Sequence, residues 1–193
     1  MQELHHMIQT QGISMSGGIL RVDSFLNHRI DTGLMIRMGQ TFYEAFHKNP
    51  VDLILTAESS GIAVALSTAQ AFGNIPMVFA KKGGAANMDN SVYESRLYSY
   101  TRGVETTIRV SREYMPKGAR VLIIDDFLAN GEAAGALVSI VRQAGAQVSG
   151  IGICIEKAFQ SGGAALRSAG YKVVSLASIT AIRDGKPVLM PDK

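Results

Sequence analysis

The sequence Arg120-Val-Leu-Ile-Ile-Asp-Asp-Phe-Leu-Ala-Asn-Gly-Glu-Ala-Ala-Gly135 decides the predicted fold. Its apolar run at residues 121–124 predicts a strand that is buried on both faces of a parallel sheet. Asp125 and Asp126 follow directly, and a helix is predicted to begin near Glu132 after a short loop. Because ligands of open α/β sheets bind at the carboxyl ends of the strands, this junction is a candidate binding site.

The two halves of this candidate site favour different chemical groups. Free backbone amides and the positive dipole end at a helix start favour a phosphate. Two adjacent carboxylates favour sugar hydroxyls or a divalent cation, and without such a partner their charges repel each other. A sugar phosphate satisfies both halves. The structural alternative is a buried strand that simply ends in two capping aspartates.

The composition is that of an ordinary globular protein, for which we expect one domain over residues 1–193. The chain is 47% hydrophobic and 18% charged, which suffices to bury a core. A net charge of +3 without a dense basic block argues against nucleic acid as a partner. No apolar window is long enough to cross a membrane. The single cysteine, Cys154, and an N-terminus without a secretory pattern predict a cytoplasmic protein.

Strands and helices alternate along most of the chain. This alternation predicts an α/β fold with a doubly wound, mostly parallel sheet and an inserted antiparallel ribbon. Residues 1–30 are expected to contribute a small hood over the site, with 12–27 as loop and one short strand, and 183–193 as turn and tail. The predicted helices are 2–11, 32–48, 62–72, 132–144 and 161–169, the strands are 51–57, 76–81, 148–155 and 171–179, and the ribbon is 96–102 with 106–111.

A second strand–loop–helix junction carries Ser59 and Ser60. Glu58-Ser-Ser-Gly61 partly matches the Gly-x-Ser-x-Gly elbow of hydrolases, but its first glycine is missing. All 4 histidines also precede Ser59, whereas the hydrolase order is serine, acid and then histidine. We therefore favour an anion-binding loop at this junction.

Two lysines and a polar stretch are predicted at the same sheet edge. Lys81 ends the strand at 76–81 and is followed by a polar loop at 82–95, whose length predicts a lid or binding loop. Lys157 follows the strand at 148–155. Lys157 taken alone is more typical of a solvated strand-end lysine, and the Lys81 loop is as typical of an exposed surface as of a site. The predicted position of Lys157 on the same sheet edge as Asp125 and Asp126 favours a binding role instead. Neither a dinucleotide-binding fingerprint nor a Walker A motif occurs in a suitable context.

The segment Val121-Leu-Ile-Ile-Asp-Asp-Phe-Leu-Ala-Asn-Gly-Glu-Ala133 resembles the phosphoribosyl diphosphate motif of the type I phosphoribosyltransferases. Asn130-Gly131 stands where Thr-Gly is more common, so phosphate binding should depend more on backbone amides. With residues 20–28, 58–61 and 150–157, the chain resembles the bacterial members that act on xanthine. The resemblance implies a homodimer that converts xanthine and 5-phospho-α-D-ribose 1-diphosphate (PRPP) to xanthosine 5′-monophosphate and pyrophosphate in purine salvage.

The resemblance also implies a role for each candidate residue. Asp125 and Asp126 would bind the ribose hydroxyls and stabilise an oxocarbenium-like transition state. Lys157 would donate to the 6-oxo group of the purine, and the loop at 82–95 would close to exclude water. Mg²⁺ would arrive with PRPP, without a direct protein ligand. The remaining PRPP-binding residues would be Ala129, Asn130, Gly131, Glu132, Ala133, Ser59, Ser60 and Lys81, and the remaining base-binding residues Leu20 and Asn27.

Two alternative functions share these features. A transferase for guanine or hypoxanthine would use Lys157 in the same way, because both bases carry a 6-oxo group. Only the resemblance at Leu20 and Asn27 distinguishes a transferase for xanthine from one for guanine or hypoxanthine. A non-catalytic regulator that senses PRPP would need a DNA-binding module, but the residues before the first long strand offer no basic recognition helix. An enzyme is therefore favoured.

Overall fold

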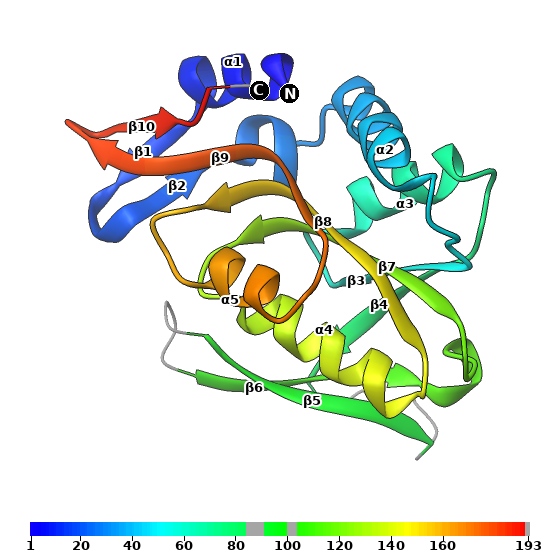
Figure 1. Ribbon diagram of the computed structural model, residues 1–193. Coiled ribbons are helices and arrows are strands. Elements are labelled where there is room, and N and C mark those ends of the chain that lie inside the picture. Colours follow the sequence, from blue (N-terminus) through cyan, green and yellow to red (C-terminus); the bar gives the residue numbers. More distant parts are fainter. Residues whose placement is uncertain (84–90, 100–103, 192–193) are drawn as a thin grey trace.

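The computed structural model describes residues 1–83, 91–99 and 104–191, and an eight-stranded sheet runs through this part of the chain. The strand order is β10-β9-β8-β7-β3-β4-β6-β5. The run from β9 to β4 is parallel, while β10 and the β5–β6 ribbon pair antiparallel. Figure 1 places α2 and α3 on one side of the sheet and α4 and α5 on the other. The predicted doubly wound α/β fold is confirmed.

The elements have the following bounds. The sheet contains β3 (Leu53–Ala57), β4 (Met77–Lys82), β5 (Val92–Ser99), β6 (Val104–Ser111), β7 (Arg120–Leu128), β8 (Gln147–Lys157), β9 (Val173–Arg183) and β10 (Lys186–Leu189). The helices are α1 (Gln2–Gln11), α2 (Thr32–Phe46), α3 (Ile62–Ala71), α4 (Glu132–Gln143) and α5 (Gly162–Ser168). A separate hairpin consists of β1 (Ile13–Met15) and β2 (Ile19–Arg21), and the short turns are η1 (Ser16–Gly18), η2 (Asp23–Asn27) and η3 (Arg112–Tyr114).

The core forms two layers, one on each face of the sheet. On one face, α2 buries a stripe at spacing four, and Asp31 caps the helix by accepting a 2.9 Å hydrogen bond from the amide of Leu34. On the other face, α4 and the ribbon cover β7. Val121 and its apolar neighbours up to Ile124 are completely buried. An uninterrupted apolar run is what a strand covered on both faces requires.

The strand order reverses between β3 and β7. The chain continues from β3 to β4 on one side, and from β7 to β8 and β9 on the other. At such a reversal the loops that follow the two central strands diverge, which leaves a crevice at the carboxyl edge of the sheet. Both strands that precede the candidate serine and phosphate-binding loops therefore end beside this crevice.

Two predictions for the ends of the chain were wrong. Residues 12–27 form the β1–β2 hairpin with the turns η1 and η2, and three-residue strands are too short to reveal a twofold pattern. The predicted tail at 183–193 contains β10, which pairs with β9 across the turn at Asp184-Gly185. Both turn residues have positive φ, 49° and 71°, which is the backbone that an Asp-Gly hairpin turn favours.

The predicted ribbon and loop boundaries were also wrong. The ribbon strands are β5 and β6 instead of 96–102 and 106–111, because Tyr93 and Leu97 already pack against the core on one face of β5. Residue 82 belongs to β4 and residues 92–95 belong to β5, so the predicted loop at 82–95 is shorter. Residues 84–90 of that loop and residues 100–103 of the ribbon lie outside the described part of the chain.

The described helices include none that is both long enough and apolar enough to cross a membrane.

Candidate functional site

The acidic pair lies at the carboxyl end of β7, next to the strand reversal. Asp125 and Asp126 are 6% and 7% exposed. The amide of Asp126 donates to Oδ1 of Asp125 at 3.1 Å, and Nδ2 of Asn27 lies 3.5 Å from Oδ2 of Asp126. Burial, and next the negative charge of Asp126, raise the pKa of Asp125 well above its ordinary value, while the positive charge of Lys82 opposes this shift. A cationic ligand would therefore be favoured here.

The serine loop, residues 58–61, packs directly against the acidic pair. A Cβ atom at Gly61 would lie 2.1 Å from Oγ1 of Thr56 and 2.8 Å from Oδ1 of Asp125, so only glycine fits at this position. Ser59 is exposed and Ser60 is half-buried, and the peptide bond between Glu58 and Ser59 is cis. The end of the serine loop thus lies against Asp125.

The phosphate loop, residues 129–133, runs from the end of β7 into the start of α4, as the sequence predicts. Gly131 has a φ of 91° and directly precedes α4, a conformation that a side chain would strain. Asn130 and Glu132 are exposed, and with Gly131 they line a hollow of about 280 Å³ that Ser95 and Arg96 of β5 border. The loop amides at this helix start are suited to an anion.

The three residues predicted to contact the base come from the hairpin region and from β8. Lys157 ends β8, and its Nζ donates to the carbonyl of Gly18 at 3.0 Å and lies 5.9 Å from the ring centroid of Phe127. Burial lowers the pKa of the Lys157 ammonium. Leu20 is buried in β2, and Asn27 reaches Asp126. The structure therefore connects residues 18–27 to both the lysine and the acidic pair.

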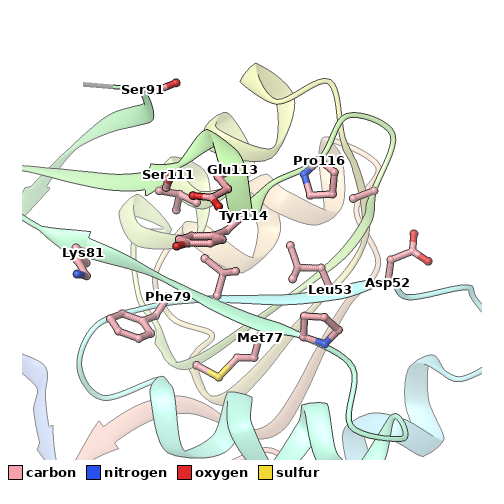
Figure 2. Close-up of a pocket in the computed structure, with 14 residues that line it drawn as sticks. Asp52, Leu53, Met77, Phe79, Lys81, Ser91, Ser111, Glu113, Tyr114 and Pro116 are labelled. Carbon is pink, nitrogen blue, oxygen red and sulfur yellow. The ribbon is translucent and has the colours of Figure 1, made fainter. Parts of the chain in front are cut away.

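Lys81 and Lys82 differ in their surroundings. Lys82 donates its amide to Oε1 of Glu58 in the serine loop at 2.6 Å, and its charge acts on Asp125. Lys81 instead lines one end of a separate hollow of about 860 Å³ between β4, β6 and η3, where Phe79 and Tyr114 are also exposed (Figure 2). Lys82 was not predicted as a site residue, although the twofold alternation of a strand places consecutive lysines on opposite faces.

The described residues contain no group of three or more histidine, cysteine, aspartate or glutamate side chains arranged to hold a metal ion. Asp125 and Asp126 are the buried acidic pair at this edge. A pair of carboxylates can assist a cation that has most of its oxygen ligands from elsewhere, such as from a polyphosphate.

The chain is similar to one protein family over most of its length. A family model described as phosphoribosyl transferase domain matches residues 29–186. Xanthine phosphoribosyltransferase of Laribacter hongkongensis is 49% identical over 186 residues, which cover 96% of this chain and 98% of the relative. The Geobacillus thermodenitrificans protein of the same name is 50% identical over 185 residues, with 96% and 95% covered.

Solved structures match the fold at lower identity. Adenine phosphoribosyltransferase of Trypanosoma brucei is 20% identical and superposes with a TM-score of 0.78 over 95% of this chain and 82% of that one. At this identity the likeness shows the shared fold alone.

Proposed function

The chain belongs to the phosphoribosyltransferase family, and from this membership we propose that it converts xanthine and PRPP to xanthosine 5′-monophosphate and pyrophosphate in purine salvage. The observation that carries the proposal is the meeting of three groups at one sheet edge. These are the acidic pair, the phosphate loop and Lys157. The acidic pair suits the hydroxyls of a ribose, the phosphate loop suits a 5′-phosphate, and Lys157 suits the oxo group of a 6-oxopurine.

PRPP is proposed to bind across the strand reversal. Backbone amides of the phosphate loop would hold the 5′-phosphate, since they lie at the start of α4. Asp125 and Asp126 would accept hydrogen bonds from the ribose hydroxyls and stabilise positive charge that develops at the anomeric carbon as pyrophosphate leaves. Ser59 and Ser60 would donate to the diphosphate beside them. Because Asp125 is buried, positive charge on the sugar would stabilise its ionised form.

Two lysines are candidates for the leaving group. Lys81 was predicted to bind the diphosphate, and Lys82 adds a charge that faces Asp125 and a contact to the serine loop. Both follow Ala80 at the end of β4, where the alternation of a strand directs their side chains to opposite faces. We propose Lys82 as the closer of the two.

Mg²⁺ is proposed as the cofactor, bound chiefly through PRPP. The acidic pair suits such an ion, because it supplies carboxylate oxygens next to the serine loop. When bound, Mg²⁺ would neutralise charge on the leaving diphosphate. Asp125 and Asp126 are the protein groups that would face it through water.

Lys157 is proposed to select the base. Its ammonium has three N–H groups, of which one is directed at Gly18, so others remain for the 6-oxo group. Adenine carries an amino donor at that position and would be rejected, since donors would face each other. Leu20 and Asn27 would cover the base from the hairpin side.

A competition assay tests the proposal. Xanthine, guanine and hypoxanthine would be supplied together with limiting PRPP and Mg²⁺, and the three monophosphates would be separated by chromatography. We expect xanthosine 5′-monophosphate to dominate. A preference for guanine would refute the base assignment, whereas no turnover of any base would refute the enzymatic function.

We also propose that the protein is a cytoplasmic homodimer. The exposed apolar side chains Phe79 and Tyr114 beside the larger hollow support an interface there. The single, buried Cys154 agrees with a reducing compartment.

A further inference from the structure

Helix α5 packs directly on the phosphate loop. The amide of Gly162 donates to the carbonyl of Ala129 at 3.1 Å. A Cβ atom at Gly162 would lie 2.5 Å from that carbonyl oxygen and 2.5 Å from the amide nitrogen of Gly131. The first residue of α5 therefore touches the loop backbone so closely that glycine is required. Any shift of α5 would be transmitted to residues 129–131.

An ion pair fixes the other end of α5 to β8. Arg167 donates through Nη1 and Nη2 to the two carboxylate oxygens of Glu156, at 2.7 Å each, and Ser175 adds a hydrogen bond at 2.5 Å. Glu156 is 4% exposed. Burial pushes the pKa of Glu156 upward, but the hydrogen bonds from Arg167 and Ser175 outweigh it, so the pKa lies below its ordinary value.

The start of α5 also lies against this ion pair. A Cβ atom at Gly163 would lie 1.9 Å from Oε1 of Glu156 and 2.6 Å from Nη1 of Arg167. The consecutive glycines 162 and 163 thus allow α5 to touch the phosphate loop on one side and the ion pair on the other. The geometry links the end of β8 to the end of β7 through a single short helix.

The ion pair lies on the face of β8 away from the proposed base site. Glu156 and Lys157 are consecutive in β8, so their side chains point to opposite faces. Lys157 reaches Gly18 and Phe127, while Glu156 reaches α5 and β9. Glu156 and Arg167 therefore act on a ligand only through the backbone. A buried ion pair often adds little net stability, because desolvation offsets the attraction.

We propose that Arg167 is a positioning residue for the phosphate loop. Its ion pair with Glu156 fixes α5, and Gly162 of α5 then fixes the backbone of residues 129–131 in the shape that binds a 5′-phosphate. This role rests on the proposed function for its substrate, PRPP. Loosening of α5 would misplace the loop amides while the base site around Lys157 stays intact.

The substitution Arg167→Met tests this role, because it keeps the apolar stem and removes the ion pair. We expect KM for PRPP to rise about tenfold while KM for xanthine changes little, since misplaced contacts weaken the group that they hold. Calorimetry with ribose 5-phosphate, which carries the phosphate without base or diphosphate, should show a similar loss. Arg120→Met is the matched control, because it breaks the paired contacts of Arg120 with Asp52 at the amino edge of the sheet.

The double variant Glu156→Gln with Arg167→Met separates positioning from an unpaired buried charge. It removes that charge and should melt no lower than Arg167→Met alone, yet KM for PRPP should stay raised. Recovery of the wild-type KM would overturn the proposal, as would an equal rise in KM for xanthine. If neither the wild type nor any variant turns over PRPP, the proposed enzymatic function is refuted. The calorimetric binding of ribose 5-phosphate to wild type and to Arg167→Met then still tests the role of Arg167.

Discussion

The carboxyl group of Asp125 makes stability depend on pH. Because its pKa is raised in the folded protein, the folded state binds a proton more tightly than the unfolded chain. The folded state is then favoured at low pH, and this advantage is lost as pH rises from the ordinary value of 3.8 through the raised pKa. Near neutral pH the buried carboxyl is therefore a cost to folding.

The variant Asp125→Asn should remove that cost. We expect its melting temperature to exceed that of wild type at pH 7, with a much smaller difference at pH 4, because asparagine stays neutral at both. Turnover should fall by about 100-fold, since the charge proposed to stabilise the transition state is lost. Thermal melts at the two pH values and a steady-state assay measure both effects. A larger gain at pH 4 than at pH 7 would contradict this account.

Lys82 should matter more for PRPP than Lys81. Its ammonium acts on Asp125, whereas Lys81 lines the separate hollow. We expect Lys82→Met to raise KM for PRPP by about tenfold, equivalent to one lost charged hydrogen bond, and Lys81→Met to change it less. The two variants lose the same charge one residue apart, so each controls for the other. A larger rise in KM for PRPP in Lys81→Met than in Lys82→Met would favour Lys81 as the lysine that binds the diphosphate.

Single residues were predictable from sequence where a strand end marks them. Asp125 and Asp126 follow a clear apolar strand, and Lys157 follows another, so their common edge could be inferred. Lys82 was missed because strand ends are uncertain by a residue or two. Gly162 and Arg167 were missed because their importance comes from contacts with distant segments, which no local pattern encodes.

At the scale of elements, the β1–β2 hairpin contacts Lys157 of the proposed base site through its turn. Gly17 and Gly18 have φ values of 76° and 73°, and this turn aims the carbonyl of Gly18 at Lys157. A Cβ atom at Gly18 would have room, since its nearest neighbour is Phe159 at 3.8 Å. An alanine there would therefore act through backbone strain alone.

The variant Gly18→Ala should raise KM for xanthine severalfold and leave KM for PRPP near wild type, because strain of about 1 kcal/mol would shift the turn. Gly73→Ala is the control, since Gly73 follows α3 with a φ of 84° and a Cβ atom added to it would meet open space. It should lose similar stability without a change in either KM. Parallel rises in both KM values for Gly18→Ala would show that the turn does not serve the base site.

Long periodic elements were the predictable ones. The spacing of Leu34, Met38 and Phe42 locates α2, and capping by Asp31 locates its start. The hairpin at 13–21 was not predictable, because its strands have three residues each and its register depends on packing against the rest of the chain. The turn at Asp184-Gly185 was predicted, but the strand β10 that follows it was missed, although an Asp-Gly turn signals a hairpin.

At the scale of the whole molecule, the exposed edge of β4 supports association of two chains. β6 pairs with β4 at Lys81 and Lys82, so among the described strands the preceding stretch of β4 pairs with β3 alone. Phe79 lies in that stretch and is 37% exposed. An unpaired edge with apolar side chains favours contact with another chain.

The variant Phe79→Asp should therefore dissociate the proposed homodimer. We expect light scattering after gel filtration to report the mass of two chains for wild type and of one chain for the variant, because a charge would be buried in the interface. Ile36→Asp is the control, as Ile36 is 63% exposed on α2. A monomeric wild type would refute the proposed assembly.

The overall topology was predictable because each step of it has a local cause. Apolar strands that alternate with amphipathic helices require parallel pairing and crossovers, which leaves few arrangements. The place of the strand reversal was not predictable from composition or periodicity. It depends on the order in which the strands pair. The strands β3 and β8 are both apolar and both pair with β7, so their patterns do not distinguish their places in the sheet.

The origin of the two proposed half-sites on different parts of the chain has an evolutionary consequence. The proposed sugar phosphate half-site comes from β7 and β3, whereas the proposed base half-site comes from the N-terminal hairpin and the last residue of β8. Mutations in the hairpin can therefore change which base binds without altering the residues of the proposed sugar phosphate half-site. Divergence by exchange of one such segment would let a single ancestral scaffold give rise to enzymes for several purines.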